Sequence, residues 1–212
     1  MKTKFISLVK NHKFIVCFCA VVLLPAEAAQ AGGNLVVNGG FESPVIVPPY
    51  QVDVVPTGWT GDGDLVVQGY ASAVNSGDGN QWFDLNPDVS AGTGLSQVIS
   101  FTAGDSYTFS FLYNGGGGGT TTAISYSIGS DIAGSVSTAA LNVYSGSPWA
   151  IFSTTFTASS ANETLDFLPN GVYSGGFIDA VQITPAAVPE PATLAWAGLG
   201  GLASLLVGFR RK

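Results

Sequence analysis

Residues 106–113 read Ser-Tyr-Thr-Phe-Ser-Phe-Leu-Tyr, and this short stretch decides the fold class. Its four aromatic side chains, Tyr107, Phe109, Phe111 and Tyr113, recur at every second position. Successive side chains of a β-strand point to opposite faces, so a period of two places all four rings on one face of a strand. The stretch therefore predicts a strand whose aromatic face is buried in a core.

Similar but shorter patterns lie on both sides of this strand. Turn-forming clusters of Gly, Asn, Asp, Ser and Pro separate them, and no stretch before residue 189 shows helical periodicity. Many short strands with one apolar face predict an all-β protein, a β-sandwich formed by residues 32–187 as one domain. The further strands are expected at residues 35–37, 52–55, 65–68, 82–85, 95–101, 124–128, 152–156, 164–168 and 177–183.

The N-terminal 31 residues have the organisation of a secretory signal peptide. Four lysines within the first 13 residues precede an apolar run at residues 14–24, and Ala29-Gln30-Ala31 supplies a cleavage site of the A-x-A type. A membrane anchor is the alternative, but the apolar run is short for a span. We expect cleavage after Ala31, which removes residues 1–31 from the folded protein.

The C-terminal segment, residues 188–212, has three parts. Pro189-Glu190-Pro191 is followed by an uncharged run at residues 192–209 and by the basic end Arg210-Arg211-Lys212. A helix of this length spans roughly 27 Å, close to the thickness of a bilayer's hydrocarbon core. We expect a transmembrane helix with its basic end in the cytoplasm. The alternative is a buried core helix, for which the glycines and prolines are poorly suited.

This three-part tail resembles the PEP-CTERM sorting signal of Gram-negative bacteria. The resemblance implies an exosortase as partner, which recognises Pro189, Glu190 and Pro191 and cleaves near them. It also implies a transient anchor in the inner membrane, followed by release to the cell surface or to an extracellular matrix.

Between the two ends, the chain is purely anionic. Every Lys and Arg lies in the first 13 or the last three residues, and the only His and both Cys lie within residues 12–19. Of 14 acidic residues, Glu27 and Glu190 lie outside residues 32–187, so this body carries 12. The body can therefore form no salt bridge between side chains, disulfide, Cys/His metal site or Ser-His nucleophile, and it offers no basic surface for nucleic acid.

The uncompensated negative charge of the body bears on its ligands. Like charges repel and destabilise a compact state. Bound calcium would relieve the repulsion, because carboxylate and carbonyl oxygens are the ligands it prefers. The alternative is an acidic surface screened by dissolved salt.

A second resemblance runs through most of the body. Residues 34–42, Asn-Leu-Val-Val-Asn-Gly-Gly-Phe-Glu, resemble the N-terminal signature of galactose-binding-like jelly rolls. These domains include carbohydrate-binding modules and proteins of bacterial and plant cell surfaces. The resemblance implies a jelly-roll sandwich and a role associated with glycans. Further matching stretches follow in the expected order at residues 57–59, 78–86, 94–97, 103–111 and 177–181.

Asp179 is the unusual residue of the last matching stretch. By strand periodicity it shares a face with Phe177, Val181 and Ile183, and we expect that face to point inward. A buried carboxylate without a partner is costly, and backbone amides or a metal ion are the available remedies. The domain family implies a structural calcium ion bound by Glu42 and Asp179.

Asn38 and its neighbours would add carbonyl oxygens to this implied calcium site. Ala180 stands where the family has a second acid, which weakens the case for a metal. The alternative is that loop amides donate hydrogen bonds to Asp179.

Large aromatic residues are the candidates for sugar binding. Trp59, Trp82, Trp149 and Tyr50 are those we expect to stack on a sugar ring, although core packing is the alternative for Trp59 and Trp82. Together these features predict a non-catalytic protein that associates with extracellular polysaccharide. A structural or adhesive matrix component without a ligand site is the alternative. A glycoside hydrolase would need two carboxylates at a defined separation, and the sequence marks no such pair.

Overall fold

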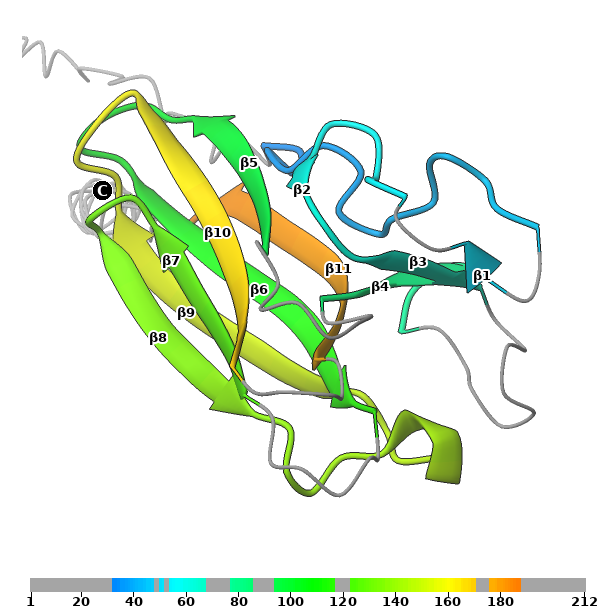
Figure 1. Ribbon diagram of the computed structural model, residues 1–212. Coiled ribbons are helices and arrows are strands. Elements are labelled where there is room, and N and C mark those ends of the chain that lie inside the picture. The colour runs from blue at the N-terminus through cyan, green and yellow to red at the C-terminus, as the bar shows by residue number, and fades with distance from the viewer. Residues whose placement is uncertain are drawn as a thin grey trace, which may run out of the picture.

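The computed structural model describes residues 32–47, 50–51, 54–67, 77–85, 94–116, 123–170 and 176–187. These residues form two antiparallel β-sheets packed face to face, so the predicted all-β sandwich is confirmed (Figure 1). The predicted signal peptide at residues 1–31 and the sorting signal at residues 188–212 lie outside the described residues. Within the described ranges, no helix is long and apolar enough to cross a bilayer.

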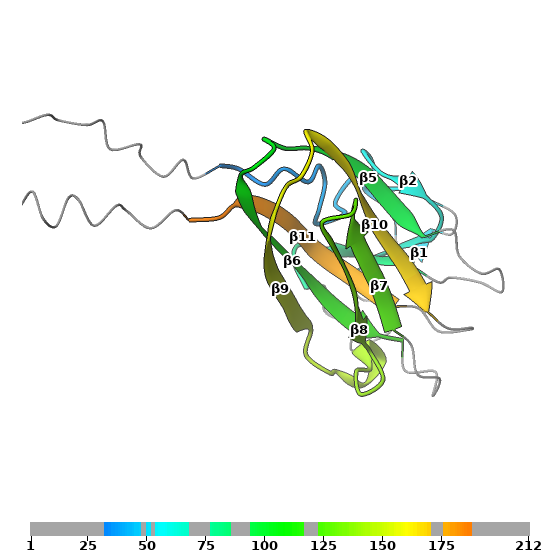
Figure 2. The same cartoon turned by 90° about the vertical axis from the view of Figure 1, so that its left-hand side faces the viewer.

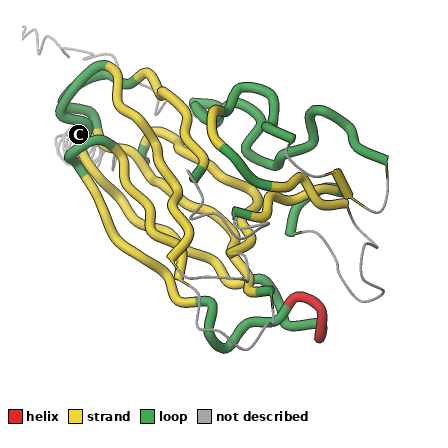
Figure 3. Tube along the Cα trace, in the orientation of Figure 1, coloured by secondary structure: helices red, strands yellow, loops and turns green. Residues whose placement is uncertain are grey.

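The strands divide into a six-stranded and a five-stranded sheet (Figure 3). The six-stranded sheet has the order β1 (Tyr50–Gln51), β3 (Asp64–Val67), β4 (Gln81–Asp84), β11 (Gly176–Pro185), β6 (Ser106–Gly115) and β9 (Ala150–Thr157). The five-stranded sheet has the order β2 (Thr60–Gly61), β5 (Leu95–Ser100), β10 (Asn162–Asn170), β7 (Ala123–Ile128) and β8 (Ile132–Ser137). A short 3-10 helix, η1 (Val143–Ser145), lies in the connection between β8 and β9.

The aromatic stretch that predicts the fold forms β6, which pairs with β11 on one side and β9 on the other. Its residues Tyr107, Phe109 and Phe111 are buried, as the alternation predicts. Phe111 meets Phe167 of the opposite sheet edge to face, with ring centroids 5.1 Å apart. Burying one such side chain contributes about 1.5–3 kcal/mol, so this row of rings holds the two sheets together.

A β-bulge in β11 changes which side chains face the core. Ala180 has a φ of 48°, and the pairing of β11 with β6 shifts between Asp179 and Gln182. Ile178, Val181 and Ile183 consequently belong to the core between the sheets, whereas Phe177 belongs to a second cluster. The expectation that Asp179 shares the inward face with Val181 is wrong, because the bulge reverses the alternation between them.

The first described segment lies along the last strand. The Leu35 amide donates to the Ile183 carbonyl at 2.8 Å, and the Val181 amide donates to the Gly39 carbonyl at 2.9 Å. The side-chain amide of Asn34 donates to the Val181 carbonyl, and its oxygen accepts from the Ile183 amide. Both ends of the described body therefore lie at one end of the sandwich, as Figure 2 shows.

Candidate functional site

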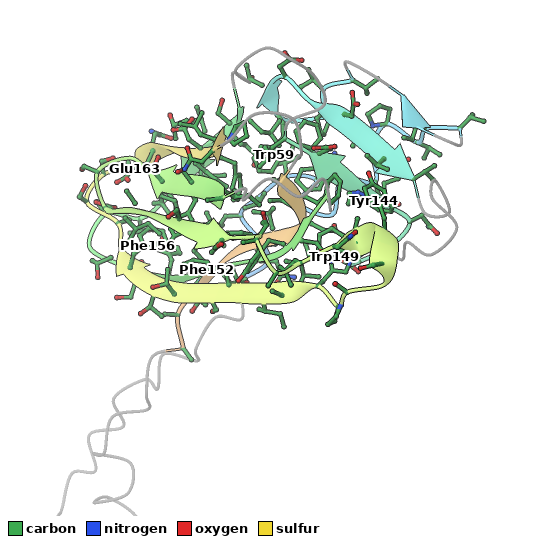
Figure 4. All side chains as sticks on the ribbon, turned by 60° about the horizontal axis from the view of Figure 1, so that its bottom comes forward. Trp59, Tyr144, Trp149, Phe152, Phe156 and Glu163 are labelled. Carbon is green, nitrogen blue, oxygen red and sulfur yellow. The ribbon has the colours of Figure 1, made fainter. Side chains whose placement is uncertain are left out.

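An aromatic cluster covers the outer face of the six-stranded sheet. Its buried members Trp82 and Phe177 come from β4 and β11. The loop after β8 brings Tyr144 and Trp149 against them, and Figure 4 shows these two residues together at one end of the sandwich. We call these four residues the outer aromatic cluster.

Local sequence explains why this loop turns back onto the sheet. The Asn142 side chain accepts a hydrogen bond from the Ser145 amide and caps η1. Gly146, with a φ of 80°, ends the helix in a conformation that favours glycine. Val143 is thereby buried against Trp82 and Phe177 of the outer aromatic cluster, and Tyr144 follows it in the chain.

The four rings meet at angles typical of aromatic packing. The ring centroid of Trp82 lies 6.3 Å from that of Trp149 and 6.5 Å from that of Phe177. The centroids of Tyr144 and Phe177 are 5.9 Å apart, and all three pairs meet edge to face. Tyr144 is 37% exposed and Trp149 is half-buried. The indole Nε1 of Trp82 is buried and has no hydrogen-bond partner within the described part of the chain.

The four predicted sugar-binding residues are placed differently from one another. Trp59 lies in the core, 5.5 Å from Phe41, and its Nε1 donates to the Asn38 carbonyl. Trp82 is also buried, so neither indole offers an open face to a sugar.

Tyr50 pairs with Val66 in the sheet, and its side chain lies outside the described part of the structure. Of the described indoles, Trp149 alone reaches the surface. Tyr144 was not predicted, because its only signal in the sequence is an aromatic residue within the turn-forming stretch 142–146.

Asp179 is fully buried in β11, beneath the segment that precedes β4. Its Oδ2 accepts a hydrogen bond from the Asp78 amide at 2.7 Å, and its Oδ1 accepts from the Ala180 amide at 2.7 Å. Burial raises the pKa of Asp179 to about 8, and the charge of Asp78 adds to this effect. The hydrogen bonds from the backbone amides of Asp78, Ala180 and Gly77 oppose the rise but do not cancel it.

Glu42 accepts hydrogen bonds from the same segment. Its Oε1 accepts from the amides of Asn80 at 2.6 Å and Gln81 at 2.8 Å. Gly79 has a φ of 67°, and a Cβ at that position would lie 2.3 Å from this oxygen. Gly77 likewise passes close to Asp179, since a Cβ there would lie 3.1 Å from Oδ2. The two glycines let one short segment supply amides to both carboxylates.

Asn38, the third predicted calcium ligand, shapes a turn. Its side-chain amide donates to the carbonyls of Ser43 and Thr57, and its side-chain oxygen accepts from the Ser43 amide. Among the residues that the structure describes, no group of three or more Asp, Glu, His or Cys side chains could hold a metal ion. Each oxygen of Asp179 accepts a hydrogen bond from a backbone amide, as the predicted alternative to calcium requires, but no cationic side chain of the body neutralises its charge.

The comparison with protein families concerns the C-terminal tail. Residues 187–212 match the PEP-CTERM protein-sorting motif, a range that includes Pro189, Glu190 and Pro191. The chain carries a PEP-CTERM sorting motif. The motif implies an exported cell-surface protein that an exosortase sorts. No curated protein matches the sequence.

Solved structures resemble the folded body. A Stig cyclase, FisC from Fischerella sp. TAU, is 17% identical with a TM-score of 0.55, and the match covers 76% of this chain and all of that one. The xylan-binding CBM22-1 domain of Paenibacillus barcinonensis Xyn10C is 15% identical with a TM-score of 0.48, over 76% of this chain and all of that one. The cyclase match shows the fold alone, and the second match is too loose to carry an argument.

Proposed function

We propose that the exported body binds an extracellular polysaccharide without catalysis, through the outer aromatic cluster. Aromatic rings that are partly exposed and rigidly packed from behind are suited to stacking on the apolar face of a sugar ring. Tyr144 and Trp149 have these properties, because Phe177 and Trp82 support them from the sheet. The observation that carries the proposal is this supported pair of rings at the surface.

The unpartnered indole of Trp82 supports the same proposal. An indole nitrogen is only a donor, and a buried donor without an acceptor costs about 1–3 kcal/mol. Sugar hydroxyls are acceptors as well as donors. Trp82 packs edge to face against Trp149, so this donor belongs to the residue that contacts the ring on which the polysaccharide would stack.

The proposed route to the site of action follows from the tail. Residues 192–209 anchor the exported protein transiently in the inner membrane, with residues 210–212 on the cytoplasmic side. The exosortase then cleaves near Pro189-Glu190-Pro191 and releases the body to the surface or the extracellular matrix of a Gram-negative bacterium. The polysaccharide-binding role would act there.

Calcium forms a separate part of the proposal. Glu42 and Asp179 come from opposite ends of the body and reach the same segment, residues 77–81. Their oxygens are ligands that calcium prefers, and no cationic side chain lies between residues 14 and 209 to neutralise them. A calcium ion bound there would stabilise the ionised form of Asp179 and hold the two ends together.

A binding experiment tests the polysaccharide proposal. The full chain, purified in detergent, is run through gels that contain one polysaccharide each, and retardation is measured for Trp149→Ala and Tyr144→Ala. We expect the dissociation constant for the retained polysaccharide to rise at least tenfold in both variants. Leu168→Ala removes a partly exposed apolar side chain from the other sheet and should leave retardation unchanged.

Two results would overturn this site. If no acidic, neutral or amino polysaccharide retards the protein, a structural matrix component without a ligand site is favoured instead. If Trp149→Ala is retarded as strongly as the unchanged protein, the ligand binds elsewhere. Release of reducing sugar from the gel polysaccharide would instead support a hydrolase.

A further inference from the structure

Two turns bring a second pair of acids together, in the other sheet and far from the outer aromatic cluster. Asp131 lies in the turn between β7 and β8, and Glu163 follows the turn between β9 and β10. Figure 4 shows Glu163 at the opposite end of the sandwich from Tyr144 and Trp149. Neither acid belongs to the site proposed above.

Glu163 is buried with only one of its two carboxylate oxygens satisfied. The side chain is 7% exposed. Its Oε1 accepts from the Ser160 amide at 3.0 Å and from the hydroxyls of Ser159 and Ser160 at 3.2 and 3.1 Å. Its Oε2 is buried and has no hydrogen-bond partner among the described residues. A buried carboxylate oxygen without a donor is destabilising.

The unsatisfied oxygen points toward the turn that carries Asp131. Gly129 precedes Asp131 by two residues, and a Cβ at Gly129 would lie 2.3 Å from Glu163 Oε2. The Gly129 amide donates to the Thr164 carbonyl at 2.9 Å, which fixes the turn against the start of β10. The two turns therefore meet around Oε2.

Asp131 contacts the same loop as Glu163. Its Oδ2 accepts from the Ser159 amide at 2.8 Å. Ser159 thus donates to both carboxylates, from its amide to Asp131 and from its hydroxyl to Glu163, which places the two acids side by side. Neither carboxylate can donate a hydrogen bond to the other while both are ionised.

The neutralising charge for this pair must come from outside the protein. No Lys, Arg or His occurs between residues 14 and 209. A single proton shared by the pair would neutralise one charge, whereas a divalent cation neutralises both. The donors are oxygens only, which suits calcium.

We propose that Asp131 and Glu163 bind a calcium ion that clamps the β7–β8 turn to the β9–β10 turn. Calcium takes six to eight oxygen ligands at 2.3–2.6 Å, so carbonyl oxygens of the two turns and water would have to complete its coordination beside the two carboxylates. With two carboxylates as the charged ligands, the affinity falls in the weak range of extracellular modules, with a dissociation constant on the order of 10⁻⁴–10⁻³ M.

The test is a calcium titration of the full chain in detergent. Calorimetry measures the dissociation constant, and thermal unfolding at each calcium concentration measures the unfolding midpoint. Glu163→Gln keeps the size of the side chain and its accepting Oε1 but removes the charge. Asp131→Asn makes the same change at a half-buried position. We expect each variant to raise the dissociation constant of one calcium site at least tenfold. The unfolding midpoint of the unchanged protein should rise between 0.1 and 10 mM calcium, and that of each variant should not.

Two control variants make the result specific. Asp166→Asn removes one charge from β10 three residues away, on the opposite face of the strand, and should leave the titration unchanged. Asp179→Asn affects only the other proposed calcium site, so the Asp131–Glu163 site should titrate normally in that variant. Failure of one calcium proposal is therefore distinguishable from failure of the other.

Several outcomes would overturn the clamp. One is a titration of Asp131→Asn that matches the unchanged protein. Asp131 is only half-buried, so its substitution decides the question even if Glu163→Gln does not fold. Another is a protein that binds no calcium at this pair and gains stability on mild acidification, which would show that the two carboxyl groups share a proton instead.

Discussion

Two buried carboxylates, Asp179 and Glu163, lie in different sheets and are satisfied to different degrees. Both belong to a body without a cationic side chain. Asp179 has a backbone amide on each oxygen, whereas Glu163 has three donors on one oxygen and none on the other among the described residues. The comparison shows that two buried carboxylates can differ in how many of their oxygens accept a hydrogen bond. The partners of each oxygen must be counted separately.

The comparison can be sharpened first by pH, with calcium removed by a chelator. The pKa of Asp179 is raised to about 8, whereas an aspartate in the unfolded chain has an ordinary value near 3.8. The folded state therefore binds the proton more tightly, and the stability that this contributes is full below about pH 4 and lost as the pH rises toward 8.

We expect the free energy of unfolding to fall by up to about 6 kcal/mol over this window, from about 4.2 pKa units at 1.36 kcal/mol each. Urea denaturation at several pH values, followed by tryptophan fluorescence, measures it. Asp179→Asn should flatten the profile. A flat profile in the unchanged protein would contradict the buried, uncompensated state of Asp179.

Removing the Asp179 carboxyl group altogether tests its structural role. In Asp179→Ala, the amides of Asp78 and Ala180 lose their acceptors in a buried place. We expect a loss of about 3 kcal/mol in the free energy of unfolding at pH 5, where the carboxyl group is protonated and its charge has no cost. Urea denaturation at that pH measures the loss, and an unchanged midpoint would show that the two amides find other acceptors.

A substitution in the β7–β8 turn tests the crowding around Glu163. Gly129→Ala places a Cβ 2.3 Å from Glu163 Oε2 and requires a φ of 47° from an alanine. We expect a cost of about 2 kcal/mol, of which backbone strain accounts for roughly half. The matched control is Gly104→Ala, because Gly104 also has a positive φ but nothing lies within 4 Å of its Cβ position. Equal unfolding midpoints for the two variants would show that Oε2 does not press on the turn.

The sequence predicted the core well because alternation is a local property. The pattern at residues 106–113 needs only its own strand, and Tyr107, Phe109 and Phe111 are buried as it indicates. The same rule failed at Asp179, because the bulge at Ala180 reverses the alternation. No residue type at this place predicts a bulge. A period of two can be extrapolated only while the strand stays regular.

The candidate sites were harder to predict because they depend on contacts between distant segments. Trp59 and Trp149 look alike in sequence, yet one packs in the core and the other lies on the loop after β8. Glu163 meets Asp131 across 32 positions, and only the pairing of β7 with β10 brings their turns together. Composition did predict that such acids lack cationic partners, since the whole body lacks them.

The position of the two ends of the body has a consequence for its orientation at work. Residues 32 and 187 leave the sandwich at the pole that holds Glu163, and Tyr144 and Trp149 lie at the other pole (Figures 1 and 4). A domain that is attached to a membrane at one end presents its opposite end to the surroundings. If residues 192–209 anchor the body in the membrane as proposed above, Tyr144 and Trp149 would face away from that membrane before exosortase cleavage.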